Sequence, residues 1–217
     1  MSRKERKNYC KTVIIFDGDN LEISLKRIGL WLSNLRLFIN NFFEKNDSLT
    51  GMENREGMFF NPIVYIVSKR VGEINRKEQN LYLNKLKKNN AGLVKLSVVH
   101  PKRSSNGYWI SCTDSEISSF IAIALLDKSI EKIILVSGDG DFLRPLKLIG
   151  IGSKKICSIG IEGSTSKQLV DYVNLMGGKS FIIEKQIPGL SEIENKKDKR
   201  KGGRDNKFTK HYLGQHQ

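Results

Sequence analysis

The amino-acid sequence predicts an α/β fold in which a doubly wound, mostly parallel sheet is flanked by helices. Short runs rich in β-branched residues alternate along the chain with stretches of helical periodicity, the order that right-handed β-α-β crossovers require. The chain has 217 residues, of which 39% are hydrophobic, enough for one sizeable core and hardly for two. We therefore expect one domain, over residues 11–187.

Six apolar runs are predicted to be strands that are buried on both faces. They cover residues 12–16, 62–68, 92–99, 132–137, 154–161 and 179–184. None reaches the length of about 18 apolar residues that a membrane span requires. Cys157 lies in the fifth run and is expected to be a small core residue. The chain has only two other cysteines, Cys10 and Cys112, and no CxxC or Cys/His spacing, which disfavours a disulfide framework and a zinc site.

Five helices are expected between these strands. The first is predicted from Leu21, Leu25, Ile28, Leu32 and Leu35, whose steps of four and three place them on one face of a helix. The others are expected near 73–90, after Asp114, over 142–149 and over 166–176. In the helix after Asp114, the inward-facing residues are predicted to be Ile117, Phe120, Ile121, Ala124 and Leu125. Residues 46–57 lack a period and are predicted to form a loop insertion.

Basic residues outnumber acidic ones, and the formal net charge is +14. Such an excess favours an anionic polymer or surface as the partner. The ends are especially basic: residues 1–10 are predicted to form an arm, and residues 188–217 a disordered tail. The first ten residues, MSRKERKNYC, lack the apolar stretch of a signal peptide, so we expect a soluble, cytoplasmic protein without a membrane partner.

Acidic residues follow two of the predicted strands directly. Asp17 and Asp19 come after the first run in VIIFDGDN, and Asp139 and Asp141 come after the fourth in ILVSGDGDF. Asp114 stands where the third helix begins. Because ligands bind at the carboxyl ends of strands in such sheets, we expect three segments to direct carboxylates to one edge. Asp is also a preferred helix N-cap, which is the competing interpretation for Asp114 and Asp141.

Carboxylates that lie together need a compensating charge. Two unit charges about 4 Å apart repel by roughly 4 kcal/mol at an effective dielectric near 20, and a hard divalent cation removes that cost. Oxygen ligands without Cys or His favour Mg²⁺ or Mn²⁺ over zinc. Such a metal activates water and neutralises charge that develops on a phosphodiester. The acidic edge therefore predicts metal-assisted phosphodiester hydrolysis.

Taken together, these motifs resemble the NYN domain, a branch of the PIN-like nucleases that includes the LabA-like bacterial proteins. The resemblance rests on DGDN, on the Asp at the start of the third helix, on SGDGDF, and on the spacing of Ser166, Leu169 and Asp171. It covers about residues 11–184 and implies a ribonuclease that uses Mg²⁺ or Mn²⁺. The implied catalytic residues are Asp17, Asn20, Asp114, Asp139 and Asp141, of which Asp17, Asp114 and Asp139 hold the metal. Asn20 is expected to be a hydrogen-bonding organiser.

RNA is the expected partner, and a homo-oligomer, although possible, is not indicated by the sequence. The basic residues predicted to contact RNA are Lys69, Arg70, Lys102, Arg103, Arg144, Lys196, Lys197, Lys199, Arg200 and Lys201.

Two alternative functions fit part of the pattern. Members of the family often have a Lys where this chain has Ser111, and a second Asp where it has Phe120, which favours an RNA-binding module with weakened catalysis. The run VIIFDGD also resembles haloacid dehalogenase-like phosphatases, in which Asp17 would be the nucleophile and Asp19 the general acid. The residues after it, Asn20 and Leu21, depart from the pattern of that family, so this interpretation is less favoured than the ribonuclease and the RNA-binding module.

Overall fold

The computed structural model describes residues 12–45, 63–89, 94–150, 152, 154–183 and 189–192. Six strands form one parallel sheet in the order β4-β3-β1-β7-β8-β9. They are β1 (Thr12–Asp17), β3 (Ile63–Ser68), β4 (Val94–Val99), β7 (Lys132–Val136), β8 (Lys155–Ile161) and β9 (Lys179–Ile183). These are the six predicted runs, and the α/β, doubly wound fold is confirmed. The predicted arm and the loop at 46–57 lie outside the described residues.

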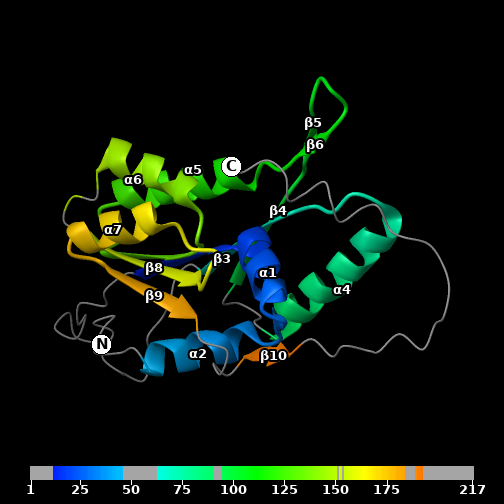
Figure 1. Cartoon of the computed structure of the whole chain (residues 1–217), viewed down its shortest axis with the longest axis horizontal. Helices are drawn as coiled ribbons and strands as arrows, with labels where there is room; N and C mark the ends of the chain where they lie inside the picture. Colours follow the sequence, from blue (N-terminus) through cyan, green and yellow to red (C-terminus); the bar gives the residue numbers. More distant parts are fainter. Residues whose placement is uncertain are drawn as a thin grey trace, which may run out of the picture.

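The direction in which strands join the sheet reverses once. From β1 the chain adds β3 and β4 on one side, and then returns to add β7, β8 and β9 on the other. The helices change face at the same point (Figure 1). One face is covered by α1 (Gly18–Arg27), α2 (Leu35–Lys45) and α4 (Glu73–Asn89), and the other by α5 (Thr113–Leu126), α6 (Leu143–Ile149) and α7 (Lys167–Leu175). The reversal lies between β1 and β7, so the ligand crevice is expected at their carboxyl ends.

The sheet separates two layers of core. Alternate residues of β1 serve opposite faces: Ile14 and Phe16 pack toward α1, whereas Val13 and Ile15 pack toward α5. The expectation that every strand is buried on both faces is wrong for β4 and β9, which are partly exposed. Both are edge strands, where the covering helical layers end. Cys157 is buried, as predicted.

The single helix predicted from Leu21 to Leu35 is wrong. The segment forms α1, then the short strand β2 (Leu30–Leu32), then α2. Gly29 adopts a φ of 76°, a left-handed conformation that ends the helical path. The apolar positions are nevertheless inward-facing, because Leu30 and Leu32 point from one face of β2 into the same core as α1. The periodicity therefore identified core residues but assigned the wrong element.

The folded part of the chain extends beyond the predicted boundary at residue 187. Strand β10 (Leu190–Glu192) pairs antiparallel with β2. The backbone N–H groups of Ser33 and Asn34 both donate to the carbonyl of Gly189, at 2.9 and 3.1 Å. Residues 189–192, which the composition of the chain assigns to the tail, are therefore part of the fold, because their pairing with β2 is non-local.

The remaining predicted helices are confirmed as α4, α5, α6 and α7, with a 3-10 turn, η2 (Gly140–Phe142), leading into α6. On α5, Ile117 and Ile121 are fully buried, and Phe120 packs against the same core layer, as predicted, but is only half-buried. A hairpin of β5 (Lys102–Arg103) and β6 (Trp109–Ile110), not predicted from the sequence, projects from the body between β4 and α5 (Figure 1). Within the described ranges, no helix is long and apolar enough to cross a membrane.

Candidate functional site

Asp17 lies at the point where strand order reverses. It ends β1 and caps α1, because its Oδ1 accepts a hydrogen bond of 3.0 Å from the backbone N–H of Asn20. The hydroxyl of Ser137, which follows β7, donates to Oδ2 at 2.9 Å. The residue is only 2% exposed. Asp17 therefore ties the carboxyl ends of β1 and β7 together through a buried carboxylate.

Burial raises the pKa of Asp17 from 3.8 to about 7. The hydrogen bonds from Asn20 and Ser137 lower the pKa, but they do not offset the loss of hydration. The nearby charges of Asp19 and Asp114 raise it further. A nearby cation would therefore stabilise the ionised form of Asp17.

Asp19 belongs to the same cluster, although the nuclease-based prediction did not include it. The backbone N–H of Ser68, at the end of β3, donates to its Oδ2 at 2.9 Å, and the side chain of Thr113, which begins α5, also hydrogen-bonds to it. Burial is the main cause that raises its pKa from 3.8 to about 6, and the charge of Glu22 adds to this. The DGD spacing was the available sequence signal, but only the fold brings β3 and α5 to this carboxylate.

Asn20 and Asp139 organise the turn after β7. The Oδ1 of Asn20 accepts a hydrogen bond of 3.3 Å from the backbone N–H of Gly138. Asp139 donates its own N–H to the hydroxyl of Ser137 at 3.1 Å and caps η2 by accepting from the N–H of Asp141 at 2.9 Å. The predicted residues Asp17, Asn20 and Asp139 are therefore connected, through Ser137, in one hydrogen-bonded network.

Asp114 and Asp141 are exposed at the rim of this network. Neither is a helix cap, so the capping interpretation is wrong for both: Cys112 occupies the N-cap of α5, and Asp139 that of η2. Asp114 is the second residue of α5 and acts on Asp17 through its charge.

Two motif glycines allow close approach of neighbouring segments rather than a left-handed turn. A Cβ on Gly18 would lie 2.7 Å from the carbonyl oxygen of Ile66, and one on Gly138 would lie 2.5 Å from the carbonyl oxygen of Ser164. Both contacts involve backbone, which cannot move aside cheaply. Packing therefore requires glycine in DGDN and SGDGDF.

The predicted RNA-contacting residues differ in their surroundings. Arg70 forms an ion pair with Glu22, so its charge is already partly compensated. Although burial raises the pKa of Glu22, the hydrogen bond from Lys26 and the charge of Arg70 lower it overall. Lys69 follows β3 and is half-buried.

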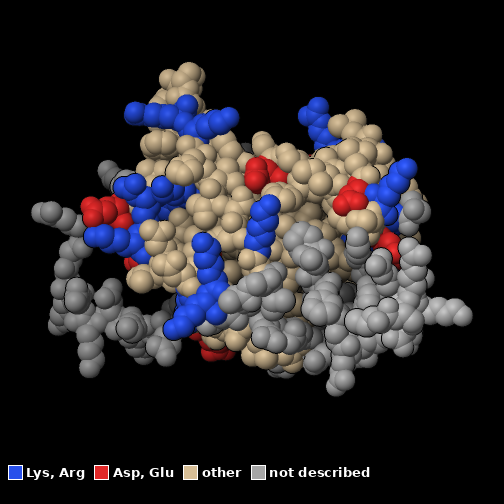
Figure 2. Space-filling model, turned by 180° about the vertical axis from the view of Figure 1, so that it is seen from behind, with Lys and Arg blue, Asp and Glu red and all other residues tan. Residues whose placement is uncertain are grey.

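The exposed residues among those predicted to contact RNA are Lys102 and Arg103 on the hairpin and Arg144 on α6. Figure 2 shows Lys and Arg side chains on the projecting hairpin and on the body beneath it. Residues 196–201 lie outside the described residues.

The donors at the edge fit a hard divalent cation in their chemistry, since they are carboxylate oxygens. Burial raises the pKa of Asp17 and of Asp19, and the charges of Asp19 and Asp114 raise that of Asp17 further. Within the described part of the chain, however, no group of three or more His, Cys, Asp or Glu side chains lies close enough to hold a metal ion. Asp17, Asp114 and Asp139 therefore share an edge without forming a closed set of ligands.

A doubly wound parallel sheet with aspartates at its carboxyl edge is the architecture of the PIN-like nuclease class. The chain belongs to the NYN domain family within that class, and the family model matches residues 11–176. Among solved structures, it is similar to a protein of unknown function from Vibrio parahaemolyticus, with 22% identity and a TM-score of 0.51 over 84% of this chain and 98% of that one. This likeness extends to the fold alone. No curated protein matches the chain.

Proposed function

We propose that the protein is a metal-dependent endoribonuclease that hydrolyses phosphodiester bonds in RNA. The observation that carries the proposal is the convergence of carboxylates from three segments where strand order reverses, with the pKa of Asp17 raised to about 7 and that of Asp19 to about 6. Such carboxylates need a cation to be fully ionised at neutral pH. Membership of a family of PIN-like nucleases supports this interpretation.

Asp17, Asp114 and Asp139 are proposed to hold Mg²⁺ or Mn²⁺, and we add Asp19 to this set. When bound, the metal supplies an activated water and neutralises charge on the phosphodiester. The residues of the chain supply the positioning. Ser137 and the N–H of Asn20 each hold one oxygen of Asp17, which leaves further lone pairs of both oxygens for a ligand.

Hydrogen bonding by Asn20 serves to hold the two strand ends in place. Its Oδ1 binds the N–H of Gly138, so the backbone that carries Asp139 is kept in a fixed position relative to α1. We assign Asn20 a positioning role and Asp141 a place at the outer rim, where it is exposed. Exposed Lys102, Arg103 and Arg144 are proposed to bind RNA phosphates.

A catalytically weakened RNA-binding module is the second candidate, and the surroundings of Phe120 favour it. The ring occupies the position of the family's second Asp, and Lys95 Nζ lies 5.5 Å from its centroid. Nearby, Glu116 accepts a hydrogen bond of 3.2 Å from Ser97 rather than standing free. The phosphatase alternative is disfavoured, because the family model that matches the chain over residues 11–176 is that of the NYN domain.

The test is a time course with pooled unstructured and structured RNAs in Mn²⁺, in Mg²⁺ and in EDTA. Asp17→Asn and Asp139→Asn should each abolish most cleavage, because Asn can still cap a helix but carries no charge. Glu131→Gln is the matched control, since Glu131 is exposed and precedes β7 at the opposite edge of the sheet. Binding without cleavage would identify the RNA-binding module, and cleavage that persists in EDTA would contradict the metal-dependent mechanism.

A further inference from the structure

The β5–β6 hairpin rises from the same edge of the sheet as the acidic cluster. Its first strand follows the carboxyl end of β4, where the N–H of Lys69 donates to the carbonyl of Val99 at 2.7 Å. Its second strand leads within three residues to Thr113, whose side chain hydrogen-bonds to Asp19. Both roots of the hairpin are therefore attached beside the candidate site.

Large apolar side chains on the hairpin face water. Tyr108 is 64% exposed, Trp109 48% and Ile110 53%. Within the described ranges, Tyr108 and Trp109 are the large aromatic side chains that are exposed to water, and they are adjacent in sequence. Because such exposure is unfavourable in water, two neighbouring rings on a projecting ribbon indicate a contact surface.

The hairpin also brings cations beside these apolar groups. Arg103 pairs with Trp109, and Lys102 pairs with Ile110, so each face of the ribbon combines one positive charge with one apolar side chain. The Nε of Arg103 donates to the carbonyl of Gly107 at 3.3 Å. The N–H of Ser104 donates to the carbonyl of Tyr108 at 2.7 Å. These bonds hold the tip in a defined conformation.

We propose that this hairpin is a stacking platform for unpaired RNA, in which Trp109 stacks on a base while Arg103, on the same face, binds an adjoining phosphate. Tyr108 and Lys102 extend the contact surface with a second ring and a second cation. The inference rests on the proposed ribonuclease function, and it names the substrate class as single-stranded RNA. Aromatic rings stack on any base, but only where the base is not already stacked inside a duplex. The location of the hairpin would direct the bound strand to the acidic edge.

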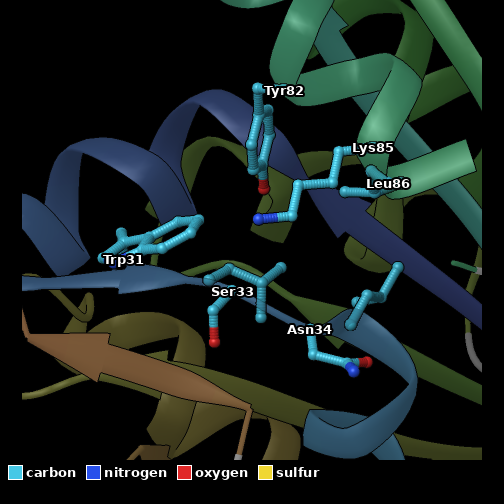
Figure 3. Close-up of a pocket in the computed structure, with 8 residues that line it drawn as sticks. Trp31, Ser33, Asn34, Tyr82, Lys85 and Leu86 are labelled. Atoms are coloured by element: carbon cyan, nitrogen blue, oxygen red, sulfur yellow. The ribbon is translucent and has the colours of Figure 1, made fainter.

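The other tryptophan differs in its surroundings. Trp31 lines a small pocket with Ser33, Asn34, Tyr82 and Lys85 (Figure 3). Lys85 Nζ lies 5.5 Å from the centroid of the Trp31 ring. This ring is already covered by a cation of the same chain, so we assign it no base-stacking role.

Tryptophan fluorescence can test the proposal directly. The chain has two tryptophans, so Trp31→Phe leaves Trp109 as the reporter. Titration with a short unpaired RNA in EDTA should quench its emission, and the same RNA annealed to its complement should not. The chelator stops metal-dependent cleavage, so this readout does not depend on the proposed activity. Equal quenching by the duplex, or none by the unpaired RNA, would overturn the proposal.

Substitutions separate stacking from general apolar contact. Trp109→Leu should weaken binding of unpaired RNA about tenfold, whereas Trp109→Phe, which keeps an aromatic face, should retain most of it. Leu175→Ala is the control, because Leu175 is 82% exposed at the end of α7. It lies beside the amino end of β9, away from the carboxyl ends of the strands. Circular dichroism would verify that each variant is folded. Unchanged RNA affinity of Trp109→Leu would refute the stacking role, even if sedimentation showed that this variant self-associates less than the wild type.

Discussion

Replacing Asp17 by Asn should change how protein stability depends on pH. The pKa of Asp17 is raised from 3.8 to about 7, chiefly by burial, so the folded protein holds a proton there that the unfolded chain releases at lower pH. Well below pH 4, both the folded and the unfolded state hold this proton, so it does not change the free energy of unfolding. As pH rises from 4 to 7, the unfolded chain binds fewer protons than the folded protein, and the free energy of unfolding falls.

The size of the effect follows from the pKa values. Each pKa unit corresponds to about 1.4 kcal/mol, so ionised Asp17 should lower the free energy of unfolding by about 4 kcal/mol at pH 8. Asn has no charge to desolvate, its Oδ1 can accept from the N–H of Asn20, and its amide can donate to Ser137. The Asp17→Asn variant should therefore be more stable than the wild type at pH 8 in EDTA, and should lack this part of the pH dependence.

Urea unfolding at pH 4 and pH 8, in EDTA, measures the difference. Asp141→Asn is the matched control, because it removes a hydrated charge from an exposed position on the same edge. Added Mg²⁺ or Mn²⁺ should stabilise the wild type at pH 8 and have less effect on Asp17→Asn. If the wild type and Asp17→Asn lose the same stability between the two pH values, the buried carboxyl does not carry an uncompensated charge, and the electrostatic argument for a cation is refuted.

Three further results are expected. Gly138→Ala should lower stability by about 1–3 kcal/mol in thermal melting and reduce cleavage, because its Cβ would lie 2.5 Å from the carbonyl oxygen of Ser164; wild-type behaviour would contradict the packing requirement. Removing residues 195–217 deletes eight basic and two acidic groups, so RNA binding should weaken and its salt dependence should flatten, while stability should not change. Removing residues 188–217 should also lower the melting temperature, because it deletes β10. Phe120→Ala should cost about 2 kcal/mol in urea unfolding, less than a fully buried ring, and a cost of about 4 would show that the ring is core.

Local patterns in the sequence were enough to predict the sheet and most of the helices. All six runs form its strands, because a parallel sheet covered on both sides leaves continuous apolar segments. The positions of Asp17 and Asp139 at strand ends followed from the same runs, since parallel strands place their carboxyl ends at one edge. These properties depend on neighbouring residues along the chain, so one sequence reveals them.

Only the tertiary structure decided which distant segments meet. Strand β2 exists because β10, from the far end of the chain, pairs with it, and no local pattern around Leu32 distinguishes that strand from a helix. Asp19 enters the cluster because folding brings Ser68 and Thr113 to its carboxylate. The raised pKa of Asp17 is likewise a tertiary property. Hydration, burial and the distance between charges depend on which segments fold together, whereas hydrophobic periodicity is written in the local sequence.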